Sequence, residues 1–459
     1  MDQKLPTCKY SDLRDSSTCP HPVANNDLCI YHDPEYGNQN QDRLVDSFKS
    51  LVEQAKRSHH PLICRGFYVP EIDLGRVKFD AEVDFTGAHF KKVSFRFAIF
   101  SNKADFTGAT FLEETDFTGA TFLEEVVFSE TRFVKYIDFK RANFKWAVFF
   151  LCKASCGSNF GYAKFSERAE FVGTYFLESV NFYKTNFKRG VNFANCRFLK
   201  EAFFVWTKFG ETVDNIADFR SAIFSESAIF GNSFFPGKTV FIYSLFKGET
   251  EFTNCDFGTF TEDFNSYADF TASTFLGHLD FGYSKFMKAV FASTSFGEKT
   301  DFTYTVFTNA KFTQAYFSGQ ATFYKTNFRE KPDFSDVLFE NARKVLFSVD
   351  RLYATSFINT DVTSVRFSKD LKWEQEGWEK HKNEKIDSSV DLEALKAVYR
   401  NLRENYENSF RFFDAQVYHI REMDLKRKYR LHEKPIVKGI KPEPKKNGFI
   451  SCTLSLTGL

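Results

Sequence analysis

The chain lacks the features that mark most membrane, secreted and polyanion-binding proteins. Only 3 of its 459 residues are Met and 4 are Trp, and Lys plus Arg (61) almost balance Asp plus Glu (60). The net charge of +1 therefore names no oppositely charged partner. No apolar run reaches the ~18 to 20 residues of a membrane helix, and the first residues lack the apolar core of a signal peptide. These absences predict a soluble, cytoplasmic protein.

Disulfide and catalytic patterns are also missing. The nine Cys are an odd number, and without secretory features they argue against a disulfide framework. The sequence has no phosphate-binding Gly-rich loop, no Gly-x-Ser-x-Gly and no His-Glu-x-x-His. Many Asp residues precede Phe, but they recur with a repeat, whereas a catalytic pair would interrupt one. We therefore expect a protein that is not an enzyme.

Phe is the residue in excess, with 61 copies. The copies recur in steps of five and six, and the ten residues at 105–114 are repeated at 116–125. A helix would space apolar residues by 3.6 positions and a strand by two, so the chain must turn between successive Phe residues. A small or β-branched residue two positions before each Phe also points inward. We expect a solid core of Phe rings without a lumen, represented by Phe106, Phe117, Phe128, Phe139, Phe182, Phe193, Phe281 and Phe302.

This motif resembles the pentapeptide repeat, a five-residue unit with a small residue, a polar residue and a central Leu or Phe. The resemblance covers residues 62–367 and implies an all-β solenoid, a right-handed quadrilateral β-helix. Four units make a coil of ~20 to 22 residues, so about 13 coils spaced ~4.8 Å apart form a rod of ~60 Å. The sequence departs from the family by adding a sixth residue to about every other unit, which predicts bulged corners or faces. Gaps in the series predict loops at 152–158, 211–216 and 258–264.

Before the repeat, residues 1–40 contain Cys8, Cys19, Cys29 and His32. Three thiolates and one imidazole are the ligands of a structural Cys3His zinc site, and a module this small needs such a metal to fold. The segment resembles Cys3His modules that precede pentapeptide repeats in some family members. The competing interpretation is three reduced cysteines in a flexible arm, and His21 is an alternative ligand. Residues 41–61 follow as a linker that contains a capping helix over 42–57.

After the repeat, a charged linker at 368–389 leads to an amphipathic helical segment at 390–431. This segment resembles the helical region that precedes channel-like membrane segments in some relatives, although no such segment follows here. Its stripe is too long to rest on one coil, so it must form a hairpin, lie along the rod or pair with another chain. We expect a homodimer through Leu395, Tyr399, Leu402, Tyr406, Phe413, Val417 and Ile420.

The remaining residues, 432–459, form a basic tail that we expect to be disordered. Such a tail suits peripheral contact with anionic lipid, although a solvated helix end explains the charges somewhat better. We interpret the whole as a non-enzymatic interaction scaffold whose protein partner is unknown. The alternatives are a DNA mimic that binds topoisomerases and the cytosolic part of a channel-like relative. There is no strong nucleic-acid signal, because the repeat is nearly neutral and its Phe rings must be interior.

Overall fold

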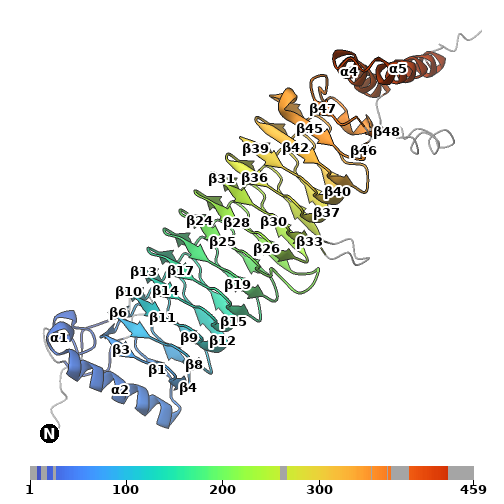
Figure 1. Ribbon diagram of the computed structural model, residues 1–459. Coiled ribbons are helices and arrows are strands. Elements are labelled where there is room, and N and C mark those ends of the chain that lie inside the picture. Colours follow the sequence, from blue (N-terminus) through green and yellow to red (C-terminus); the bar gives the residue numbers. More distant parts are fainter. Residues whose placement is uncertain are drawn as a thin grey trace, which may run out of the picture.

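The computed structural model describes residues 8–11, 18–23, 27–258, 266–352, 354–369, 371–373 and 392–432. Figure 1 shows a rod of stacked coils with helices at both ends. At one end lie α1 (Pro34–Gln39) and α2 (Gln41–Ser58), and at the other lie α4 (Leu392–Asn408) and α5 (Phe412–His432). The rod between them begins at β1 (Leu62–Ile63) and continues to β47 (Arg366–Phe367).

Each coil has four sides. In the first coil these are β1, β2 (Tyr68–Val69), β3 (Ile72–Asp73) and β4 (Lys78–Phe79). All four pair in parallel with the next coil, so that Leu62 meets Val83 and Phe79 meets Phe100. The β2 side forms a 13-stranded sheet and the β3 side a 14-stranded sheet. The expected four-sided β-solenoid of about 13 coils is confirmed.

The two remaining sides merge into one 19-stranded sheet. They merge because four longer strands run across the corner between them, namely β12 (Thr121–Val127), β15 (Asn143–Val148), β37 (Lys285–Val290) and β40 (Val306–Lys311). Within β12, Phe122 pairs with Phe100 of β8 (Ile99–Phe100), and Val126 pairs with Ala104 of β9 (Ala104–Asp105), and β8 and β9 lie on two neighbouring sides of the preceding coil. One strand therefore serves two neighbouring sides of the same coil.

The interior is a stack of Phe rings in columns. The ring centroids of Phe106 and Phe128 lie 4.9 Å apart with an interplanar angle of 8°, and Phe106 also meets Phe117 edge-on at 5.9 Å. These offset and edge contacts are the favourable geometries for aromatic pairs. Every Phe that we selected as core is fully buried: Phe106, Phe117, Phe128, Phe139, Phe182, Phe193, Phe281 and Phe302.

One column is interrupted at Ala154, which pairs with Phe133 on one side and Phe176 on the other. The shorter side chain leaves a small internal cavity beside Cys152 and Ser158. The loop that we predicted at 152–158 is therefore wrong, because β16 (Lys153–Ala154) and β17 (Ser158–Asn159) continue the coil. Ala154 still points inward, so the backbone path survives the loss of the ring. The predicted loop at 211–216 is confirmed up to Asn215, and 259–264 lie outside the described residues.

Two of the four corners are tight turns that follow every second Phe. Ala98 N–H donates to Phe95 O at 2.9 Å, and the residue between them, Phe97, has φ 56°. A left-handed third residue closed by this bond is the pattern of a type II turn. The extra sixth residue falls at the two other corners, for example within residues 101–103, where no left-handed residue occurs. The predicted bulges are therefore confined to alternate corners.

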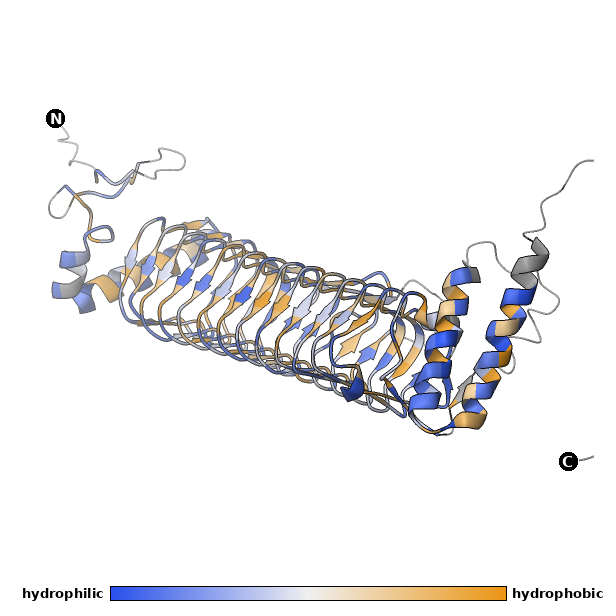
Figure 2. Ribbon diagram, turned by 90° about the horizontal axis from the view of Figure 1, so that it is seen from above, coloured by the Kyte–Doolittle hydropathy of each residue, from blue (hydrophilic) through white to orange (hydrophobic). Residues whose placement is uncertain are grey.

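Both ends of the rod are covered. Leu44, Phe48 and Val52 of α2 are buried over the first coil, as the predicted helix over 42–57 required. At the far end α4 and α5 form a hairpin, which Figure 2 shows side by side. The predicted linker also contributes a strand, because β48 (Lys372–Trp373) pairs with β46 (Arg351–Leu352). Residues 374–391 and the predicted tail at 433–459 lie outside the described residues.

Candidate metal centre and interaction surfaces

The four predicted metal ligands meet in space. The ligand atoms of Cys8, Cys19, Cys29 and His32 all lie within 4.8 Å of one another, and all four residues are buried. Cys19 Sγ is 3.8 Å from Cys29 Sγ, and His32 Nδ1 is 3.3 Å from Cys29 Sγ and 3.5 Å from Cys8 Sγ. The predicted alternative ligand, His21, is not part of the cluster and packs edge-on against Tyr31 instead.

These separations suit one tetrahedral ion. With Zn–S bonds of about 2.3 Å, two sulfurs on a tetrahedron lie about 3.8 Å apart, and a sulfur and a nitrogen slightly less. A disulfide would need its sulfurs at about 2.05 Å. The cysteines are free, and their spacing is compatible with that of ligands around a shared cation.

Contacts outside the cluster fix the ligands and tie them to the rod. His32 Nε2 lies 2.9 Å from Arg65 O in the first coil, so Nε2 carries the proton and Nδ1 faces the thiols. Tyr10 stacks on His32 with ring centroids 3.8 Å apart, and Tyr31 stacks on Phe67 of the first coil at 4.6 Å. A hydrogen bond from the second ring nitrogen, such as that from His32 Nε2 to Arg65 O, orients a metal-binding imidazole. The centre therefore joins the N-terminal module to the first coil.

Burial determines the electrostatics of the cluster. Burial raises the pKa of Cys29 to about 12, with further contributions from Cys19 and Cys8. Burial likewise raises the pKa of Cys19 and lowers the pKa of His32. Neutral imidazole is the form that binds metal, whereas thiolates in this position need a positive charge to stabilise them.

One side chain of the C-terminal hairpin contacts several backbone carbonyls of the last coil. Asn405 of α4 is buried and its Nδ2 donates to Val362 O at 2.7 Å, Thr363 O at 3.0 Å and Val365 O at 2.7 Å. These carbonyls belong to the last coil and have no further coil to pair with. Asn405 therefore blunts an edge that would otherwise attract another strand.

A buried carboxylate holds the two helices together. The side chain of Glu422 on α5 is 1% exposed and contacts Arg403 at 2.8 Å, Lys426 at 2.8 Å and Arg400 at 3.4 Å. Burial opposes ionisation of Glu422, but the Lys426 bond and the charges of Arg403, Lys426 and Arg400 outweigh it, so its pKa is lowered. Arg403 and Arg400 come from α4, so this cluster crosses the hairpin.

The structure divides the predicted oligomerisation stripe into two groups. Leu395, Tyr399, Leu402 and Tyr406 are buried within the monomer. Tyr406 stacks on Tyr418 of α5 with centroids 5.6 Å apart. The second group lies on the other face of α5, where Phe413 is 90% exposed, Val417 45% and Ile420 54%. Only this second group is available to another chain.

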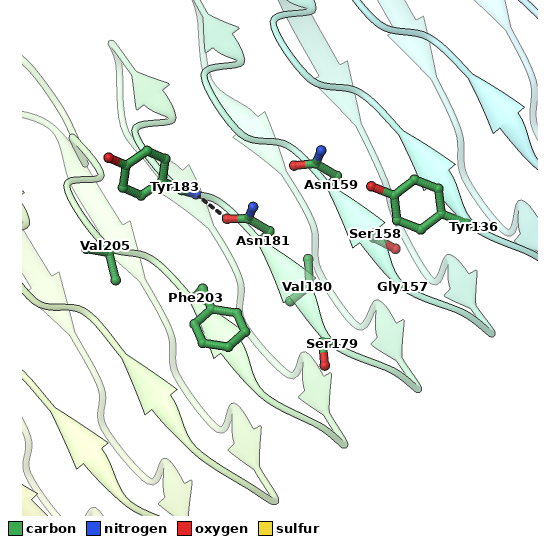
Figure 3. A pocket seen from close by; sticks show the side chains of 10 residues that line it. All are labelled: Tyr136, Gly157, Ser158, Asn159, Ser179, Val180, Asn181, Tyr183, Phe203 and Val205. Carbon is green, nitrogen blue, oxygen red and sulfur yellow. Dashed lines mark hydrogen bonds between the residues drawn. The ribbon is translucent and has the colours of Figure 1, made fainter.

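A shallow hollow lies on the β3 side of the middle coils. Figure 3 shows its lining, with Asn159 and Asn181 between aromatic side chains. Tyr136 and Phe203 stand at its two ends, and Tyr183 lies at its edge. The sequence reasoning missed this surface because it treated the aromatic residues as interior. The available signal was the position of the Tyr and Trp residues, many of which lie between the periodic Phe positions and not at them.

The fold is that of a parallel β-solenoid protein. Residues 98–143 match the family model described as pentapeptide repeats (9 copies). The same four-sided coil continues on both sides of this pentapeptide-repeat segment. No curated protein and no solved structure matches the chain. Among the helices that the structure describes, none combines the length and apolarity needed to cross a bilayer.

Proposed function

We propose that the protein is a non-enzymatic interaction scaffold in which two rods are joined through α5. The observation that carries the proposal is the composition of α5, which has apolar side chains on two faces. One face, with Ala415, Tyr418 and Leu425, is buried in the monomer. The other face is exposed although it contains Phe413, Val417 and Ile420. A helix that is apolar on more than one face normally has more than one partner element.

A second copy of the chain is the occupant that this face suits best. Phe413, Val417 and Ile420 are separated by four and three residues, the spacing of a coiled-coil seam. A twofold axis between two α5 helices would make the interface self-complementary. Two hairpins would form a four-helix bundle between the rods.

Light scattering tests this arrangement. We expect the full chain to have the mass of a dimer and a chain ending at Asp387 to have the mass of a monomer. Val417→Glu places a charge in the centre of the seam and should give a monomer with an unchanged circular dichroism spectrum. Tyr243→Glu is the matched control, because Tyr243 is 70% exposed on the rod and should leave the dimer intact. A monomeric full chain, or a dimer that survives Val417→Glu, would refute the proposal.

We further propose that the Cys3His cluster binds one zinc ion, which supports the scaffold by holding the cap on the rod. The ligand set, the near-tetrahedral spacing and the His32 contact to Arg65 support zinc over the flexible-arm alternative. Bound zinc would supply folding energy and no chemistry, because four protein ligands leave no open position for a substrate. Elemental analysis of the intact protein should give about one zinc per chain.

The runner-up function is DNA mimicry at a topoisomerase. Acidic side chains on the β3 side of the first coils favour it: Glu71, Asp73, Glu114, Asp116 and Asp138 line one hollow there. Lys92 interrupts this group, and Asn159 replaces Asp in the next coil. A duplex carries about one charge per 1.7 Å, so an acidic run this short reproduces little of it. Failure to compete with DNA for a topoisomerase would remove this alternative. Cytoplasmic location, lipid contact of the basic tail and descent from a channel-like relative stay predictions.

A further inference from the structure

The two left-handed corners of each coil carry different kinds of side chain. One corner column is dominated by small or neutral residues: Gly66, Gly87, Gly108, Glu130, Leu151, Gly173, Asn195, Ser221, Tyr243, Ala272, Ser293, Gln314 and Asp336. The second column is rich in rings and cations: Arg76, Phe97, Gly119, Arg141, Tyr162, Lys184, Trp206, Asn232, Asn254, Tyr283, Tyr304 and Lys325. Glycine adopts this conformation most easily, so bulky residues there carry backbone strain. Non-Gly residues stand in both columns, but only the second column gathers rings and cations at its corner, and this difference points to a use of those side chains.

In the middle of the rod, the second column and its flanking positions form a basic-aromatic strip. We define the strip as Lys140, Arg141, Tyr162, Lys164, Tyr183, Lys184, Trp206 and Lys208. Two of its rings are exposed, Tyr162 by 40% and Trp206 by 52%, and the third, Tyr183, is half-buried. Cations and rings alternate from coil to coil, since Arg141 and Lys184 both lie 5.8 Å from the Tyr162 ring centroid.

The cations of the strip are not neutralised by carboxylates. Among the described residues, no carboxylate oxygen lies within 4.0 Å of the side-chain nitrogens of Lys140, Arg141, Lys164, Lys184 or Lys208. Nearby acids are engaged elsewhere: Glu167 pairs with Arg189 at 3.0 Å, Glu211 pairs with Lys188 at 3.7 Å, and Glu201 accepts from Ser179 at 2.7 Å. The strip therefore keeps a local positive charge on a chain whose overall charge is close to zero.

The neighbouring β3 side loses its negative charge over the same coils. In other coils an Asp closes the turn, as Asp73, Asp116, Asp138, Asp280 and Asp301 do, and Asp138 accepts from Lys140 N–H at 2.8 Å. Asn159 and Asn181 accept the same bond from Gly161 at 2.9 Å and from Tyr183 at 2.8 Å. The turn needs only one side-chain oxygen, so Asn preserves the fold while it replaces a negative oxygen with an NH2 donor. In the next two coils Phe203 and Ile229 hold this position, and acidic residues return with Glu251.

We propose that this strip and the adjoining hollow bind single-stranded nucleic acid. Cations along a groove edge hold phosphates, exposed rings stack with bases, and amide donors meet base or phosphate oxygens. Figure 3 shows the hollow with Asn159 and Asn181 between Tyr136 and Phe203. Tyr183 belongs to both the hollow and the strip, which makes the two one continuous surface. This inference is independent of α5 and of the metal centre.

Exposed rings distinguish this occupant from other polyanions. An acidic polypeptide or an inorganic polyphosphate would use the cations but has no flat ring to stack. A duplex hides its base faces within its own stack, so the rings would gain nothing from it. Only a single strand uses the cations, the rings and the amide donors together. Its affinity should therefore depend on the rings and on salt.

The test is fluorescence anisotropy of the full chain with a labelled ten-nucleotide poly-dU strand at low salt. Unlabelled duplex DNA, polyphosphate and poly-glutamate serve as competitors. Trp206→Gly and Tyr162→Gly should each weaken binding about five-fold or more, the lower range for one lost stacking partner. Neither variant should lower the melting temperature, because Gly relieves the left-handed strain at these turns. Lys184→Ala should weaken binding and reduce the slope of log K against log salt by about 0.7 per lost phosphate contact.

Tyr243→Gly is the matched control, since Tyr243 occupies the same turn position in the other column and is 70% exposed. It should bind the single strand like the unaltered chain. The proposal fails if the unaltered chain does not bind the strand, or if Trp206→Gly binds it equally well. It also fails if poly-glutamate or polyphosphate competes as strongly as the unlabelled strand, which would identify an acidic polypeptide or a plain anion surface instead.

Discussion

The two ends of the rod are covered by different kinds of contact. Each terminal coil has backbone groups with no further coil to pair with, and such edges invite association. At the N-terminal end, α2 buries Leu44, Phe48 and Val52, and the Cys/His cluster links the module to Arg65. At the C-terminal end, Asn405 Nδ2 contacts three carbonyl oxygens of the last coil, and Glu422 links the two helices of the hairpin. One cap depends on a cluster of metal-type ligands and the other on ordinary side-chain contacts.

This difference makes the ends separable by experiment. Metal availability and thiol chemistry should act on the first coils and leave the last coils unchanged. Removal of the Glu422 charge should act on the last coils, because Glu422 and its partners lie at the far end. Amide hydrogen exchange, resolved by segment, is the natural measurement, because repeat proteins can open from one end without unfolding as a whole.

The largest expected effect is loss of the N-terminal cap. Cys29→Ser should abolish zinc binding and raise exchange across residues 62–79, because structural zinc contributes on the order of 10 kcal/mol to the folding of small modules. Cys196→Ser is the control, since the Cys196 thiol is buried and donates to Phe171 O at 2.8 Å, a bond that Ser can replace. If Cys29→Ser and a chelator both leave the first coils protected, the cap does not depend on a metal.

The next largest effect comes from a Phe midway between the two ends, and its loss should destabilise the rod as a whole. Phe281→Ala removes a fully buried ring that stacks on Phe252 at 5.0 Å and on Phe302 at 5.4 Å. We expect a loss of about 3 to 5 kcal/mol in the free energy of unfolding, measured by denaturant titration. Lys285→Ala, an exposed neighbour in β37, should cost little. An equal loss in both variants would contradict the inward placement of the Phe columns.

A smaller effect isolates the C-terminal cap. Asn405→Ala leaves the carbonyls of Val362, Thr363 and Val365 without their shared donor, which should cost about 1 to 3 kcal/mol. Exchange should rise across residues 354–369 and stay unchanged in the first coils. Asn401→Ala is the control on the same helix, because its single contact, to Thr360 O, is 3.5 Å long. Equal effects of the two variants would show that packing of α4, not the Asn405 bonds, covers the edge.

The repeat could be predicted from sequence because the same Phe spacing recurs in almost every coil. Phe spacing determined the four-sided coil, and the ligand types of Cys8, Cys19, Cys29 and His32 determined the cluster. Asn405 could not be predicted, because a single Asn in a helix carries no sign of which carbonyls it will reach. Ala154 was misread as a break because a missing Phe resembles a missing coil. The basic-aromatic strip was missed because its meaning lies in which residues share a corner, and the uneven unit length concealed that register.

The smallest expected effect is the response of the C-terminal hairpin to acid. The pKa of Glu422 is lower in the folded protein than its ordinary value of 4.5, so ionised Glu422 stabilises the hairpin fully above about pH 4.5. This contribution is lost as pH falls through the lowered folded-state pKa. The loss should be modest, because the side chains of Arg400 and Lys426 are 45% and 38% exposed and water screens their charges. Exchange in α4 and α5 should therefore rise on acidification below pH 4.5, beyond the intrinsic pH dependence of exchange, and Glu422→Gln should flatten that rise. An acid response of equal size in Glu422→Gln would assign the pH sensitivity to other groups and would show that ionised Glu422 does not stabilise the hairpin.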